Sequence, residues 1–102
     1  MSAFIRTELE DMGSNSATLI HIDGEVHLDH EAEDLHLEKA IPQSLNEHEL
    51  VLNLVYRVKQ QNSPKRKHLI PRHTELVLRR DRYKTIRVRI PNGEHRVISL
   101  AG

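Results

Sequence analysis

The chain contains no cysteine and very few aromatic residues. Among its 102 residues the aromatic side chains are Phe4, Tyr56 and Tyr83, and tryptophan is absent. The lack of cysteine excludes disulfide bonds, a thiolate nucleophile and a cysteine-ligated zinc site. The scarcity of aromatic side chains leaves few surfaces on which nucleic-acid bases could stack.

The sequence also lacks segments that direct a protein to a membrane. The first residues do not contain the apolar segment of a signal peptide, and no apolar run approaches the length of a membrane span. We therefore expect an intracellular, cytoplasmic protein without membrane partners. A nuclear location is the alternative if the basic patch Lys65-Arg66-Lys67 is a targeting signal.

Sequence motifs of catalysis are missing as well. There is no glycine-rich phosphate loop, no G-x-S-x-G nucleophile motif and no H-E-x-x-H zinc motif. Histidine and carboxylate residues are plentiful, but their spacing does not predict that they converge. We expect a protein that is not an enzyme and that needs no cofactor.

The abundant apolar residues are branched aliphatic ones. Leu, Ile, Val and Phe make up 29 of the 102 residues, well above the level of about 20% below which a chain is expected to be disordered. A chain of this length buries roughly 60–68% of its unfolded surface. The sequence therefore predicts one domain, residues 1–102, with an aliphatic core.

The charges are distributed unevenly along the chain. Residues 1–50 carry twelve Asp and Glu but two Lys and Arg, whereas residues 51–102 carry three acidic and thirteen basic residues. The halves therefore have formal charges of about −10 and +10, which cancel. Either acidic strands lie beside basic strands within one molecule, or the surface is acidic on one side and basic on the other.

Most of the chain shows the alternation of apolar and polar residues that is typical of strands. It predicts strands at 4–9, 17–22, 26–29, 35–38, 74–79, 83–90 and 95–100. Asp-Gly at 23–24 and Asn-Gly at 92–93 predict hairpin turns. A two-residue loop at the second turn would place Val88 opposite Val97.

The segment 45–61 fits two structures. As a strand it would direct one face inward, formed by Leu50, Leu52, Leu54, Tyr56 and Val58. As a helix it would carry a continuous apolar stripe, and the capping box Ser44-x-x-Glu47 and the following Asn62 and Pro64 favour this choice. We therefore predict an α+β fold, a small β-rich antiparallel sheet with one central helix at about 45–61. The alternative is an all-β sandwich or barrel in which this segment is the central strand.

A metal site is conceivable near the first predicted turn. A three-residue loop at 23–25 would place His21 opposite His27, with Asp29 one step along, and these side chains could hold zinc. A two-residue loop would put the two histidines on opposite faces and remove the site. We expect solvent-facing histidines rather than metal ligands.

The basic residues of the second half are the candidate binding residues. Arg87 and Arg89 share one face of a predicted strand, and Arg96 would lie across from Arg89. Like charges directly opposed are unfavourable, so an anionic group should neutralise them. The full set of candidates for contact with a partner or a phosphate is Lys65, Arg66, Lys67, Arg79, Arg80, Arg82, Tyr83, Arg87, Arg89 and Arg96.

These patterns favour a non-catalytic interaction or assembly module that uses complementary acidic and basic surfaces. Its partner would be another protein or a second copy of the chain. The alternative is a nucleic-acid-binding protein that contacts phosphates through the basic C-terminal hairpins. A lesser alternative is a β domain that binds a metal through histidine and carboxylate groups.

Overall fold

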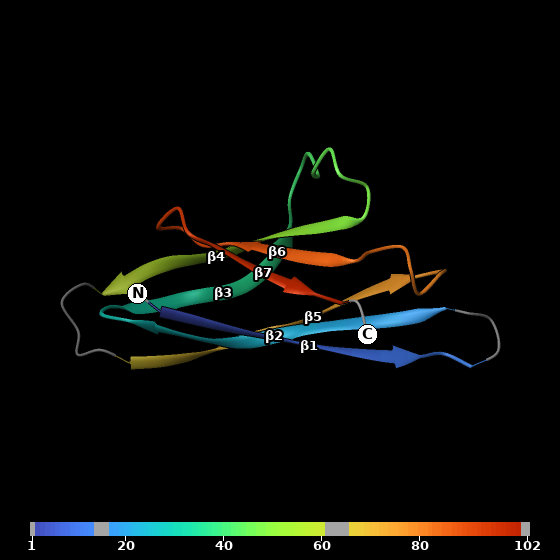
Figure 1. The fold of residues 1–102 in the computed structure, drawn as a ribbon. Coiled ribbons are helices and arrows are strands. Elements are labelled where there is room, and N and C mark those ends of the chain that lie inside the picture. The colour runs from blue at the N-terminus through green and yellow to red at the C-terminus, as the bar shows by residue number, and fades with distance from the viewer. Residues whose placement is uncertain (1, 14–16, 61–65, 101–102) are drawn as a thin grey trace.

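The structure is a β-sandwich (Figure 1). A computed structural model describes residues 2–13, 17–60 and 66–100, and all regular structure in these ranges is strand. The strands are β1 (Ser2–Asp11), β2 (Thr18–Leu28), β3 (Glu31–Lys39), β4 (Glu49–Gln60), β5 (Arg66–Val77), β6 (Thr85–Arg89) and β7 (His95–Ser99). A three-stranded sheet has the order β1-β2-β5, and a four-stranded sheet has the order β3-β4-β6-β7. No helix long and apolar enough to cross a membrane occurs in the described ranges.

The core lies between the two sheets. Alternate residues of each strand point inward, as the period of two in a strand requires. The three-stranded sheet contributes Ile20, Ile22, Val26, Leu28, Ile70 and Val77, and the four-stranded sheet contributes Leu37, Leu50, Leu52, Leu54, Ile86 and Val88. Complete burial of one such side chain contributes about 1.5–3 kcal/mol, so this aliphatic layer is the main source of stability.

The predicted central helix is wrong, and the all-β sandwich is the correct alternative. The segment forms β4, which directs Leu50, Leu52 and Leu54 into the core. Ser44, the first residue of the predicted capping box, forms a turn before the strand instead, and the predicted C-terminal signals Asn62 and Pro64 lie outside the described residues. Ser44 Oγ accepts the Asn46 amide at 3.0 Å, and Asn46 Oδ1 accepts the His48 amide at 2.9 Å. Ser and Asn can satisfy backbone groups in turns as well as at helix ends, so a cap pattern alone is ambiguous.

The predicted hairpin at 23–24 is also wrong, because β2 continues through these residues. Gly24 lies on the inward face between Ile22 and Val26. A Cβ atom at Gly24 would overlap the carbonyl oxygen of Phe4 in β1. The glycine is therefore required by the close approach of a neighbouring strand and not by a turn.

β5 extends further toward the N-terminus than the strand predicted at 74–79, because a β-bulge lets the strand continue through Pro71. Ile22 pairs with His73 and Gly24 pairs with Ile70, so Pro71 and Arg72 together face Asp23. Proline lacks an amide donor and is tolerated at a bulge or on an edge strand. The strand therefore begins at Arg66 rather than at residue 74.

The C-terminal hairpin is confirmed, but its register differs by one residue from the prediction. Val88 pairs with Arg96 instead of Val97. The loop holds three residues, because the Ile90 amide donates to the Glu94 carbonyl at 2.9 Å and Gly93 has a φ of 92°. A left-handed residue at this position is typical of three-residue hairpin loops. Arg96 consequently does not oppose Arg89.

Candidate functional site

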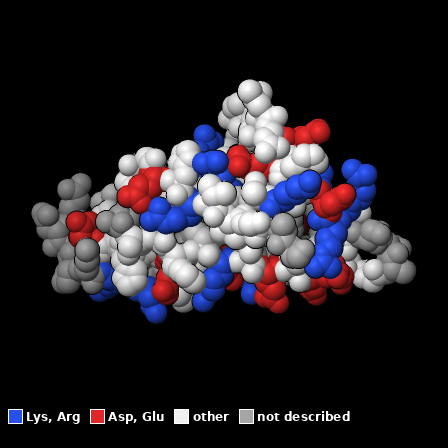
Figure 2. All heavy atoms as spheres, in the orientation of Figure 1, with Lys and Arg blue, Asp and Glu red and all other residues white. Residues whose placement is uncertain are grey.

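The acidic and basic halves of the chain meet within the molecule. Ion pairs between them include Arg57–Asp34, Arg66–Glu31, Lys67–Glu25, Arg72–Asp23, Arg80–Asp11 and Arg87–Glu49. Figure 2 shows Lys and Arg interspersed with Asp and Glu across the visible face. Pairing of acidic with basic strands, the first of the two explanations for the uneven charge, accounts for these residues.

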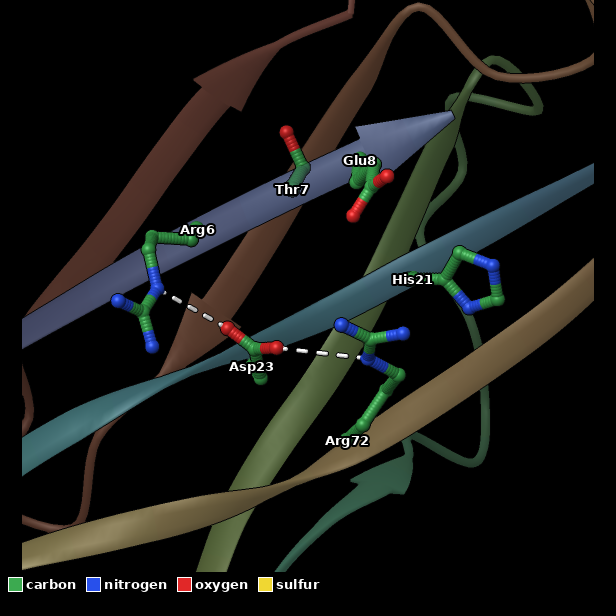
Figure 3. A pocket seen from close by; sticks show the side chains of 6 residues that line it. All are labelled: Arg6, Thr7, Glu8, His21, Asp23 and Arg72. Carbon is green, nitrogen blue, oxygen red and sulfur yellow. Dashed lines mark hydrogen bonds and ion pairs between the residues drawn. The ribbon is translucent and has the colours of Figure 1, made fainter. Parts of the chain in front are cut away.

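The outer face of the three-stranded sheet carries a shallow depression of about 280 Å³ (Figure 3). Asp23 of β2 lies between Arg6 of β1, at 3.1 Å, and Arg72 of β5, at 3.4 Å. His21 contacts Glu10 at 2.8 Å and Thr74 at 2.9 Å. The polar groups of this face are thus largely satisfied by one another across three strands, and a charged ligand would have to displace these contacts.

The structure does not bring together the three residues considered as metal ligands. His21 and His27 lie on the same strand, six residues and hence roughly 20 Å apart. Asp29 follows the strand and contacts His30 Nδ1 at 3.1 Å, a hydrogen bond that lowers the pKa of Asp29. Within the described ranges no group of three His, Asp or Glu side chains is arranged to hold a metal ion.

In the predicted basic patch at 65–67, the two described residues begin β5 and contact the acidic half of the chain. Lys65 lies outside the described residues. Arg66 is 3.5 Å from Glu31, and Lys67 is 3.5 Å from Glu25. These contacts are exposed, so each contributes at most about 1 kcal/mol, and they leave the two cations partly available to solvent.

The basic residues after β5 are tied to their surroundings in different ways. Arg79 is 3.9 Å from Asp81, and Arg80 reaches β1. The guanidinium of Arg82 lies 4.5 Å from the centre of the Tyr83 ring and donates to the Glu47 carbonyl. Tyr83 itself is buried. The one aromatic ring near the predicted basic surface is therefore covered and offers no stacking face.

Arg96 does not contribute to the outer basic face. Its Nε donates to the Ala3 carbonyl at 3.2 Å, and its Nη2 lies 2.9 Å from Glu94. This contact joins β7 to β1, so Arg96 links the two sheets at their edge.

Arg87 and Arg89 line an open cavity of about 410 Å³ above the four-stranded sheet. The other lining residues are His95, Glu49, Val51 and residues 41–44. The loop before β4 rises above this sheet, where Figure 1 draws it in green. We call this space the Arg87–Arg89 cavity.

Gln43 holds the loop over the sheet. Its amide nitrogen donates to the carbonyl oxygens of Ala40, at 2.6 Å, and Val51, at 2.9 Å, and its amide oxygen accepts the Val51 amide at 3.0 Å. The side chain thus takes the place of a neighbouring strand against β4. No sequence pattern predicts this wall of the cavity, because the wall depends on the contacts of the Gln43 side chain with Val51, eight residues along the chain.

The cavity has an excess of positive charge. Arg87 pairs with Glu49 through contacts of 3.2 and 3.5 Å. Arg87 Nη1 also donates to His95 Nδ1 at 2.8 Å, so this nitrogen is unprotonated in the contact. Arg89 donates to Asn53 at 2.8 Å and has no carboxylate partner in the described part of the chain.

The arrangement can bind an anion, since guanidinium groups form charge-assisted hydrogen bonds with carboxylates and phosphates. Apolar side chains lie beside these donors. Ile41 is 95% exposed and Val51 is buried in the cavity wall. Comparison of the chain with protein-family models, with curated proteins and with solved structures gives no match.

Proposed function

We propose that this domain is a non-catalytic interaction module that binds an acidic segment of a partner protein in the Arg87–Arg89 cavity. The proposal rests on the position and hydrogen-bond partner of the Arg89 guanidinium. Its guanidinium lines a cavity, and among the described residues it has the amide oxygen of Asn53 as its partner but no carboxylate. A carboxylate of a partner would supply the missing charge through a bidentate contact.

The lining of the cavity favours a protein segment as the occupant. Ile41, Pro42 and Val51 lie beside the arginines. A peptide with acidic and apolar side chains can bury its apolar groups against the loop while its carboxylates reach Arg87 and Arg89. This combination of apolar contact and charged hydrogen bonds is common in protein interfaces.

Nucleic acid is the second candidate, because arginines also suit phosphate groups. Binders of single strands usually add aromatic side chains on which bases stack. The described lining of the cavity contains no Phe, Tyr or Trp, and the imidazole of His95 is held by Arg87. Tyr83 is buried. An acidic and apolar protein segment therefore matches the lining of the cavity better than a nucleic acid does.

The proposal is tested by titrating the ¹⁵N-labelled protein with an acetylated peptide of about six residues that combines glutamate and leucine. We expect amide shifts in residues 41–44 and around Arg87 and His95. Arg89→Gln should weaken binding about tenfold, because a hydrogen bond to a charged group contributes about 1.5–3 kcal/mol. Lys59→Gln, the matched loss of an exposed cation on β4, should leave binding unchanged.

Two results would contradict the proposal. One is peptide binding that is unaffected by Arg89→Gln or that maps to another surface. The other is an oligonucleotide that binds more tightly than the peptide through the same arginines, which would select the nucleic-acid function instead.

A further inference from the structure

The edge strands of the two sheets differ in how they are protected from pairing with another chain. β5 contains Pro71 and a bulge, β3 contains two register shifts and the left-handed residue Asp34, and β7 has five residues. β1 spans ten residues without proline, glycine or a register shift. Natural proteins usually interrupt or cover such an edge, because its free backbone groups can pair with another strand. β1 has none of these interruptions, although Arg96 of β7 bonds to the outward carbonyl of Ala3 near one end of the strand.

The hydrogen-bonding pattern shows which residues of β1 face outward. The Met12 amide donates to the Ala17 carbonyl at 2.9 Å, so Met12 and every second residue before it bond to β2. The odd-numbered residues Ala3, Ile5, Thr7 and Leu9 therefore direct their amide and carbonyl groups to the free edge. The contact of Arg96 Nε with the Ala3 carbonyl from outside the sheet agrees with this assignment.

We propose that β1 pairs antiparallel with β1 of a second copy of this chain, around a two-fold axis at Thr7. The two three-stranded sheets would then form one sheet of six strands. Odd-numbered residues face one another in this register, as the free backbone groups require. Ile5 lies opposite Leu9 of the second copy, and Arg6 lies opposite Glu8 of the second copy.

The sequence of β1 is complementary to itself in this register. Ile5 and Leu9 already pack against the core, so their pairing continues the apolar inner face. On the outer face Glu8 has no ion pair in the described part of the chain. Arg6 contacts Asp23 through Nε, which leaves its two Nη groups for another carboxylate. Each copy would thus supply one arginine and one glutamate to two identical pairs.

The neighbouring registers are less favourable. An axis at Arg6 would place two arginines directly opposite each other, and an axis at Glu8 would do the same with two glutamates. Like charges directly opposite on a sheet are destabilising. The charges therefore select the register at Thr7, while backbone hydrogen bonds supply the attraction.

Sedimentation velocity between about 10 µM and about 500 µM protein tests the proposal. We expect the wild-type chain to shift from monomer to dimer as its concentration rises. Thr7→Pro should remain a folded monomer, because it removes an amide that points to the free edge and spares the bonds to β2. Thr7→Val keeps the amide and should dimerise like the wild type.

A charge exchange tests the register. Glu8→Arg should weaken self-association about tenfold or more, because it opposes Arg6 with a second arginine. Arg6→Glu should do the same with glutamates, and a mixture of the two variants should form the mixed dimer. Arg6→Glu places a glutamate beside Asp23. If this variant does not fold, the comparison of Thr7→Pro with Thr7→Val by itself tests whether β1 forms the dimer. A wild-type monomer at all concentrations, or a Thr7→Pro dimer as stable as the wild type, would overturn the proposal.

Discussion

Glu75 responds to two opposing influences on its pKa. Burial by itself would raise this pKa, but hydrogen bonds from Lys39 Nζ at 2.8 Å and His73 Nε2 at 3.2 Å outweigh burial and lower it. A carboxyl group with a lowered pKa in the folded state stabilises the fold above its unfolded pKa. That contribution is lost as the pH falls through the folded pKa.

Replacement of Glu75 by glutamine should therefore destabilise the protein at pH 7 and not in strong acid. We expect a loss of about 1 kcal/mol at pH 7, reduced from the usual value for charged hydrogen bonds because Lys39 is half exposed. Urea unfolding at a series of pH values measures the difference. Glu94→Gln, which changes a more exposed ion pair, is the control. A difference between Glu75→Gln and wild type that stays constant down to acid pH would contradict this account.

His36 has the opposite dependence on pH. The Asp34 carbonyl at 2.6 Å and Glu38 at 3.2 Å raise the pKa of His36 by accepting its ring protons. The stabilisation is complete below the unfolded pKa and is lost as the pH rises through the folded pKa. An NMR titration should give His36 a pKa above its ordinary value, and Glu38→Gln should remove part of this increase. A pKa at or below the ordinary value would be inconsistent with the two contacts.

At the scale of the elements, the contact between β1 and β2 depends on Gly24. Gly24→Ala should destabilise the protein by about 2–4 kcal/mol, because the added Cβ overlaps the backbone of β1. Gly13→Ala is a matched control, since Gly13 also has a positive φ but has no atom near its Cβ position. It should cost about 1–2 kcal/mol from backbone conformation alone. Thermal unfolding compares the two, and equal losses would show that the overlap is relieved without cost.

The sequence predicted the elements where one local pattern determines the structure. Strands β1, β3, β6 and β7 follow from alternation, and the C-terminal hairpin follows from Asn92-Gly93. The errors occurred where a local signal has two structural uses. Gly24 can serve a turn or a close strand contact, and Ser44 can cap a helix or a turn. Tertiary packing decides between these uses, and the contacts of that packing cannot be read from the local sequence pattern.

At the scale of the whole molecule, the ion pairs between the halves should make stability depend on salt. Raising sodium chloride from about 20 mM to about 500 mM should lower the free energy of unfolding by about 1–2 kcal/mol, because the exposed pairs are screened. Urea unfolding at each salt concentration measures this change. Stability that is unchanged or increased by salt would contradict net attraction between the acidic and basic strands.

The candidate site was predicted in part. Arg87 and Arg89 were recognised from their shared strand face, and the structure places both in one cavity. His95 and the loop at 41–44 were missed. They join the site through a one-residue change of hairpin register and through the contacts of Gln43. Residues brought together by such long-range contacts leave no periodic pattern in the sequence.

The parallel pairing of β4 with β6 has a consequence for the order of folding. The intervening strand β5 belongs to the other sheet, so the chain must cross the sandwich and return before β4 gains this neighbour. Contacts between residues so distant in sequence slow folding, and sandwiches of this kind typically fold in milliseconds to seconds. During synthesis, Leu50 and Leu52 would lack Ile86 and Val88 until residues 85–89 emerge. The nascent chain therefore passes through a stage in which β4 is an open, apolar edge that other chains could capture.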